Sequence, residues 1–109
     1  MTPQTRKASL SPARRRLLEV LQQVNFGRVE SLAIVNGEPV LDPPPRIVRE
    51  IKFGAENGPR PEISSADFLL KQQVVELLAV LDKMQNGVID VIEVKHGLPF
   101  RAIVTEVAA

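Results

Sequence analysis

The feature that most constrains the fold of this chain is an internal repeat with a constant spacing of sixty residues. Segment 17–40 aligns without a gap with segment 77–100, and seven of the 24 residue pairs are identical. Two identical pairs are glycines, Gly27 with Gly87 and Gly37 with Gly97. A repeated unit that cannot bury its own apolar face normally buries it against its copy. The sequence therefore predicts two similar units packed together.

Each copy begins with the apolar spacing of a helix. In the first copy, Ser11 can cap a helix that starts at Pro12 and stops before Gly27. In the second copy, Ser64 and Asp67 have the spacing of a capping box. Apolar residues then recur at helical intervals, at positions 70, 74, 77, 81 and 84. Both helices are expected to present an apolar stripe to a common core.

A β-hairpin follows each predicted helix. The first strands span 29–35 and 88–95, and each leads into a two-residue turn, Asn36-Gly37 or His96-Gly97. Asn-Gly is a strong hairpin signal because both central residues of the turn need a positive φ. We expect the second strand of each hairpin to start directly after the turn.

The prolines of the second strands fit this hairpin register. With a two-residue loop, Pro39 faces Ile34 and Pro99 faces Val94. Proline cannot donate a ladder hydrogen bond, so both strands are predicted to lie at an edge of the sheet near the turn.

The repeat also sets the expected domain organisation. A basic arm, 1–10, precedes a single α+β domain, 11–109, and the parts of this domain are repeat one at 11–41, an insert at 42–63 and repeat two at 64–107. The two tandem αββ units are expected to form a four- to five-stranded, mainly antiparallel sheet with two helices on one face. The insert begins with Asp42-Pro43-Pro44-Pro45, and 47–53 can add a strand within the chain or across a dimer.

The second hairpin predicts association between subunits. Strict alternation places Ile92, Val94 and Ile103 on one face of the sheet and Ile89 and Val91 on the other, so both faces are apolar. An apolar face left over after the helices have packed is a natural association surface. We therefore expect a homodimer.

The first copy resembles a known family of small proteins. A helix, Asn25-Phe26-Gly27-Arg28-Val29, an apolar strand and Asn36-Gly37 follow one another within residues 17–40. This arrangement is similar to that of the YezD-like small bacterial proteins, whose function is uncharacterised. The resemblance implies a bacterial origin and an αββ unit, and it implies no activity.

Composition narrows the classes of function. The chain has no cysteine, which excludes disulfides and thiolate metal sites. No stretch has the roughly 20 apolar residues of a membrane span, and no apolar run follows the first residues as in a signal peptide. We expect a cytoplasmic protein without a membrane segment.

Residues that could support catalysis are sparse. His96 is the only histidine and sits in a predicted turn, with no nucleophile beside it. The loop at 54–58 lacks the Gly-Lys-Ser/Thr ending of a phosphate-binding loop. We expect no enzyme activity, no metal, no cofactor and no small-molecule substrate.

The distribution of charge points to a polyanionic partner. Residues 1–16 carry five basic residues and no acid, whereas the rest of the chain has nine Lys or Arg against thirteen Asp or Glu. Because basic arms commonly contact the phosphate backbone, we predict duplex DNA binding by a symmetric dimer. The predicted contact residues are Arg6, Lys7, Arg14, Arg15, Arg16, Arg46, Arg49 and Lys52.

Two alternatives bear on this prediction. The four phenylalanines are dispersed in the sequence at 26, 53, 68 and 100, which argues against a stacking platform for single strands. A protein-interaction module that uses the apolar sheet face or the proline-rich insert is the competing function. Binding through arginines would weaken steeply with salt, and apolar docking would not.

Overall fold

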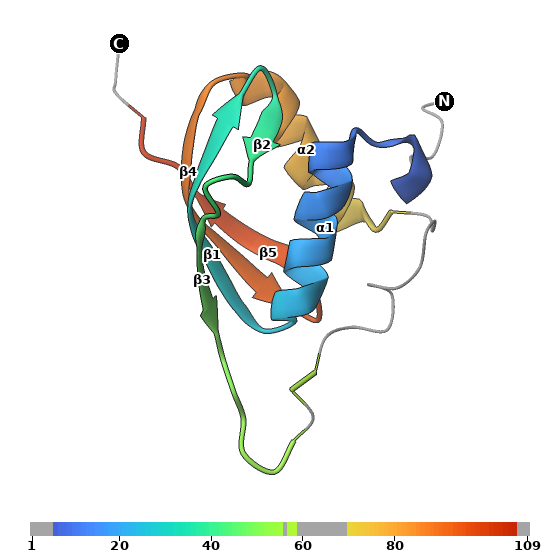
Figure 1. Cartoon of the computed structure of the whole chain (residues 1–109), viewed down its shortest axis with the longest axis vertical. Coiled ribbons are helices and arrows are strands. Elements are labelled where there is room, and N and C mark those ends of the chain that lie inside the picture. Colours follow the sequence, from blue (N-terminus) through green and yellow to red (C-terminus); the bar gives the residue numbers. More distant parts are fainter. Residues whose placement is uncertain (1–5, 56, 59–69, 107–109) are drawn as a thin grey trace.

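A computed structural model describes residues 6–55, 57–58 and 70–106 of the chain. It has the predicted α+β architecture, in which a five-stranded antiparallel sheet carries two helices on one face (Figure 1). In chain order, the elements are a short 3-10 helix η1 (Lys7–Ser9), α1 (Pro12–Val24), β1 (Gly27–Val35), β2 (Glu38–Val40), β3 (Arg46–Arg49), α2 (Gln72–Met84), β4 (Gly87–Lys95) and β5 (Leu98–Ile103).

Strand β1 organises the sheet because it pairs along both of its edges. One edge pairs with β4, and β5 pairs with the far edge of β4. The other edge of β1 is shared by β2, which pairs with Ala33–Val35, and by β3, which pairs with Gly27–Glu30. The insert strand thus joins the sheet of its own chain, over 46–49 rather than the expected 47–53.

The first helix forms where the sequence predicts it. Ser11 is the N-cap and its side chain accepts a hydrogen bond from the amide of Arg14 at 3.2 Å, with Pro12 at the first helical position. The second helix starts later than the apolar spacing suggests, at Gln72, with Lys71 as an N-cap that makes no side-chain hydrogen bond. Leu70 therefore precedes the helix, and the predicted cap residues 64 and 67 lie outside the described part of the chain.

Backbone features of the two halves recur sixty residues apart. Both helices have 13 residues and are followed by a residue with positive φ, 60° at Asn25 and 61° at Gln85. The hairpin turns also correspond, with φ of 52° at Asn36 and 54° at His96, each followed by a positive-φ glycine. The predicted register of both prolines is confirmed, since Pro39 pairs with Ile34 and Pro99 with Val94 at the sheet edges.

The two halves are joined by a reciprocal set of backbone contacts. In the β1–β4 ladder, Gly27 pairs with Val94 and Ile34 pairs with Gly87, so exchanging the halves leaves the register unchanged. Each hairpin turn also donates to the end of the helix in the other half. The Gly37 amide donates to the Gln85 carbonyl at 2.7 Å, and the Gly97 amide donates to the Asn25 carbonyl at 2.9 Å.

The core lies between the helices and the sheet, and its composition corrects the expected alternation. Ile89, Ile92 and Val94 are all buried in one cluster, although Ile89 was expected on the opposite face from the other two. Ile103 was expected on the face of Ile92, but it pairs with Val91 and therefore lies on the other face. Val29 and Leu32 share the core in the same way, with Ser31 at φ 58° between them. Alternation is therefore interrupted in the middle of both central strands, and residues three apart face the same side. Among the described residues, no helix is long and apolar enough to cross a membrane.

Candidate functional site

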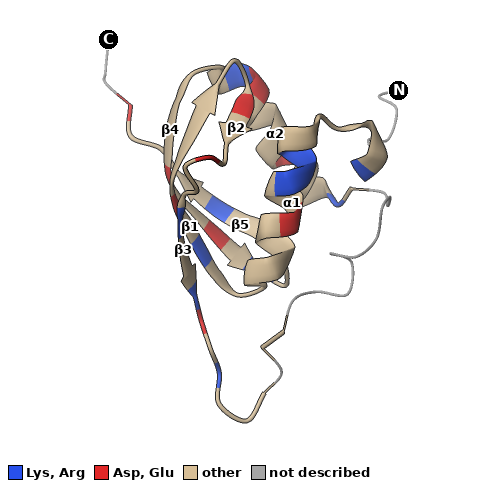
Figure 2. Ribbon diagram, in the orientation of Figure 1, with Lys and Arg blue, Asp and Glu red and all other residues tan. Residues whose placement is uncertain are grey.

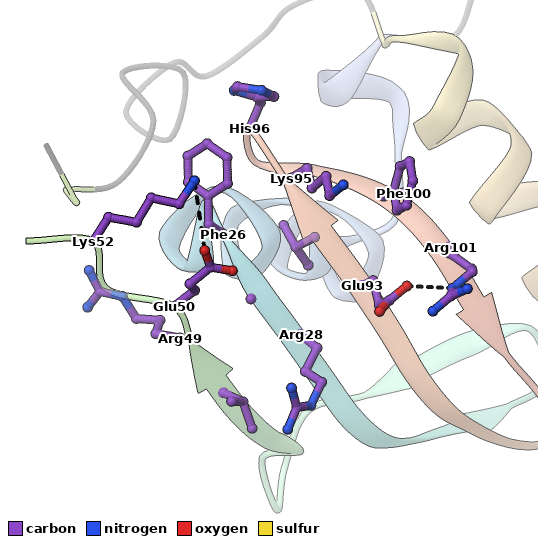
Figure 3. Close-up of a pocket in the computed structure, with 13 residues that line it drawn as sticks. Phe26, Arg28, Arg49, Glu50, Lys52, Glu93, Lys95, His96, Phe100 and Arg101 are labelled. Carbon is purple, nitrogen blue, oxygen red and sulfur yellow. Dashed lines mark hydrogen bonds and ion pairs between the residues drawn. The ribbon is translucent and has the colours of Figure 1, made fainter. Parts of the chain in front are cut away.

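A hollow of about 980 Å³ lies where β1 begins, β3 and β4 end, and β5 starts (Figure 3). Its lining is rich in charge. The basic residues are Arg28, Arg49, Lys52, Lys95 and Arg101, the carboxylates are Glu50 and Glu93, and His96 is at the edge of the same group. The hollow therefore has an excess of positive charge even with His96 neutral.

The pleat of the central strands directs these charges away from the helices. Val29 and Ile92 pair across the β1–β4 ladder and point into the core. Arg28 and Glu93 are the next pair along the ladder, so their side chains project from the opposite face of the sheet. Figure 3 shows Arg28 and Glu93 extending from these strands, with Arg101 beside Glu93.

Three of the cations have nearby carboxylate partners. Arg101 Nε donates to Glu93, Arg28 Nε donates to Glu30 at 2.7 Å, and Lys52 Nζ lies 3.8 Å from Glu50. All three cationic side chains are about half exposed or more. Exposed pairs of this kind contribute only about 0–1 kcal/mol, so an incoming anion can replace the carboxylates at little cost.

Glu30 lies beside the hollow, and nearby arginines act on its carboxyl group. Its hydrogen bond from Arg28, together with the positive charges of Arg28 and Arg46, lowers the pKa of the Glu30 carboxyl from its usual value. This carboxylate stays ionised at neutral pH and is the nearest competitor for the Arg28 guanidinium.

Two aromatic rings line the hollow, and each one has a lysine over it. Lys52 Nζ lies 5.1 Å from the centre of the Phe26 ring, and Lys95 Nζ lies 4.1 Å from the centre of the Phe100 ring. His96 packs edge-on against Phe26, with ring centres 4.8 Å apart. The fold thus brings together two phenylalanines that are far apart in the sequence.

A β-bulge controls the position of Phe100. Val94 pairs with Pro99, but Glu93, which precedes Val94 in β4, pairs with Arg101. Phe100 therefore has no partner across the ladder. Bulges turn a side chain out of the regular pleat and are common beside functional sites. The Phe100 side chain is 60% exposed.

The predicted N-terminal contact residues serve different purposes in the fold. Arg14 donates to the Gly37 carbonyl at 2.9 Å and pairs with Asp82, so it joins α1 to the first hairpin turn and to α2. Lys7 is 3% exposed, with its Nζ 3.7 Å from Glu19. Arg6, Arg15 and Arg16 are at least partly exposed.

The predicted contact residues of the insert are divided. Arg49 and Lys52 line the hollow, and Arg49 also donates to the Asn57 carbonyl at 2.7 Å. Arg46 is outside the lining and pairs with Glu30 at 3.3 Å. Figure 2 shows the cations of α1 and those of the sheet as separate groups, and the sheet lies between α1 and the face that carries Arg28.

Sequence reasoning missed Arg28, Lys95, Arg101 and the two rings. A signal for the first two was present in the repeat itself. The positions sixty residues away from Arg28 and Lys95 hold Val88 and Val35, so the two copies differ in charge where their folds agree.

No family model, curated protein or solved structure matches the chain. Within the residues that the structure covers, no group of three His, Asp or Glu side chains could hold a metal ion. The chemistry of the hollow is therefore the basis for a functional proposal.

Proposed function

We propose that this protein binds nucleic acid and that the hollow on the sheet is its main contact surface. The observation that carries the proposal is the convergence of five basic side chains, with two carboxylates, on one concave surface. Concave surfaces lined by one sign of charge focus the electric field and attract polyanions. Guanidinium groups such as those of Arg28, Arg49 and Arg101 match the oxygen geometry of a phosphate.

Comparison between the two halves of the chain supports a role for these charges beyond folding. The Val35 and Val88 positions, which correspond to Lys95 and Arg28, occupy equivalent places in the strands without any charge. The two hairpins differ in the same way. In the second hairpin Glu93 pairs with Arg101, whereas Ala33, at the position corresponding to Glu93, pairs with Val40. Because the corresponding places in the other half hold apolar residues, the hairpin fold does not itself require cations there.

This proposal changes the expected role of the basic arm. Arg14 holds the first hairpin turn against α1 and α2, which makes it a structural residue. Arg15 and Arg16 are on the helical side of the sheet and could give only a second, separate phosphate contact.

The test compares two double variants that remove the same charge. Arg28→Val with Lys95→Val alters the hollow and uses the residues found in the other half, whereas Arg15→Ala with Arg16→Ala alters α1. Fluorescence anisotropy would measure binding of labelled duplex and single-stranded oligonucleotides between about 50 and 200 mM salt. The hollow variant should bind at least about tenfold more weakly, with a salt slope flatter by about 0.7–0.9 for each lost phosphate contact.

The matched control separates a site from a general effect of charge. Equal losses in the two variants would mean that net charge alone drives binding, and the hollow would lose its assigned role. If the wild-type chain binds neither nucleic acid at about 50 mM salt, the nucleic-acid proposal is wrong.

A second candidate function is association with protein through the same sheet face, away from the hollow. Val35, Val88 and Ile103 are 50%, 46% and 45% exposed there, and a second copy of the chain is the partner that we expected. Sedimentation should then show a wild-type dimer whose stability does not depend on salt. The Val88→Lys variant should be a monomer. A monomeric wild-type chain would contradict the homodimer.

A further inference from the structure

We propose that the hollow takes unpaired nucleotides, so that single-stranded nucleic acid is the preferred ligand and a duplex is not. This inference rests on the proposed function and names its substrate class. It replaces the expectation of duplex binding, which depended on the arm and on the separation of the phenylalanines in the sequence.

The two ring and lysine pairs have the chemistry of a nucleotide site. Phe26 with Lys52 and Phe100 with Lys95 each place an ammonium group over an aromatic ring, at 5.1 Å and 4.1 Å from the ring centre. A nucleotide carries a flat base and a phosphate close to each other. The base can stack on the ring while the lysine turns to the phosphate, and Arg28 and Arg49 supply further cations on the same lining.

The other half of the chain has no aromatic ring at the positions that correspond to Phe26 and Phe100. The position corresponding to Phe26 holds Asn86, which also follows the end of a helix. The first hairpin has a continuous register, whereas the second has a bulge that leaves Phe100 without a partner. A phenylalanine that is 60% exposed contributes little apolar burial. Contact with a ligand would account for the exposure of the Phe100 ring at a bulge.

The geometry also selects against a duplex. Bases inside a double helix are stacked on their neighbours and cannot reach a ring at the protein surface unless they are flipped out. A volume of about 980 Å³ has room for a ligand of small-molecule size. Individual bases of a single strand can enter such a hollow, whereas the width of a duplex cannot.

The experiment measures the preference between strands and the contribution of one ring. Fluorescence anisotropy would measure the affinity of the full chain for a labelled thymidine oligonucleotide of about 12 nucleotides and for a duplex of the same length. The wild type should bind the single strand at least about tenfold more tightly than the duplex. Phe100→Val should weaken single-strand binding by about 5- to 150-fold and leave duplex binding nearly unchanged.

Two further variants keep the result interpretable. Phe100→Tyr retains a stacking ring and should restore binding to within a few-fold of the wild type. Phe53→Val removes a ring that is 98% exposed but does not line the hollow, and it should bind like the wild type. Circular dichroism would confirm that each variant is folded, as the exposure of both rings leads us to expect.

The possible failures are distinguishable. Equal or tighter binding of the duplex, lost with Arg28→Val and Lys95→Val, would overturn the single-strand inference and leave the nucleic-acid proposal standing. Unchanged single-strand binding by folded Phe100→Val would also overturn the stacking role. Binding of neither ligand would end both proposals.

Discussion

Gly27 and Gly87 occupy corresponding positions but face different surroundings. Both have strongly positive φ, 148° and 151°, so any side chain there strains the backbone. A Cβ added at Gly27 would lie 2.0 Å from the carbonyl oxygen of Val48 in β3. A Cβ at Gly87 would meet only the flexible side chain of Met84, at 2.9 Å. The first glycine thus allows β3 to approach β1.

This difference predicts unequal costs for the same substitution. Gly87→Ala should lower the free energy of unfolding by about 1–3 kcal/mol through backbone strain. Gly27→Ala should lower it by at least about 2 kcal/mol more, because the β1–β3 ladder must shift or open. Urea denaturation of both variants would measure the difference. Equal costs would show that β3 moves freely, and the hollow that it lines would then not be a fixed site.

The two helices begin with different capping chemistry. The Ser11 side chain accepts the Arg14 amide at the start of α1 and donates to Glu38 at 2.6 Å, which also ties the helix to β2. Lys71 holds the corresponding place before α2, and its side chain caps nothing. Neither helix has an acidic residue in its first turn. The amino end of α2 is therefore the less stabilised of the two.

Giving α2 the cap of α1 is expected to stabilise the protein. Lys71→Ser should raise the free energy of unfolding by about 1 kcal/mol, because serine accepts a helix amide that lysine leaves without a side-chain acceptor. Ser11→Ala should lower it by a similar amount or more, since it also loses the contact to Glu38. Thermal denaturation of both variants is the measurement. No gain from Lys71→Ser would mean that residues preceding the helix already satisfy these amides.

At the scale of the whole molecule, the two halves complete each other. The β1–β4 ladder keeps its register when the halves are exchanged, and each turn donates to the helix end of the other half. A fragment that ends at residue 58 retains α1 and β1 to β3 but loses β4, α2 and both turn contacts. It exposes one edge of β1 and the part of α1 that faces β5 in the intact chain.

The reciprocal register predicts how that fragment behaves. Two copies can pair through β1 with Gly27 opposite Ile34, because Val94 and Gly87 hold the corresponding places in the intact ladder. The fragment should therefore be folded only as a dimer and should unfold on dilution. Sedimentation and circular dichroism across a range of concentration would test this. A fragment that is folded as a monomer would show that the halves are independent domains.

The sequence predicts the elements well and the site poorly, for different physical reasons. Local signals define α1 and both hairpins, since a cap, a proline at the helix start and a turn that requires positive φ act within a few residues. The interruption of alternation at Ser31 and the bulge at Phe100 depend on neighbouring strands, and no local pattern marks them. The hollow includes the bulged Phe100 and residues at the end of β3. Cations and rings from four segments therefore meet where the sequence shows only scattered residues.

The difference between the two ends of the β1–β4 pair has a consequence for stoichiometry. If two identical chains formed such a ladder, each residue that binds a ligand at one end would also be present at the other end. Two binding sites would then arise together. Here both ends belong to one chain, so Arg28 and Lys95 at one end and Val88 and Val35 at the other can differ. Each chain consequently carries one such hollow, and under the proposed function a long strand of nucleic acid would bind one chain per occupied segment.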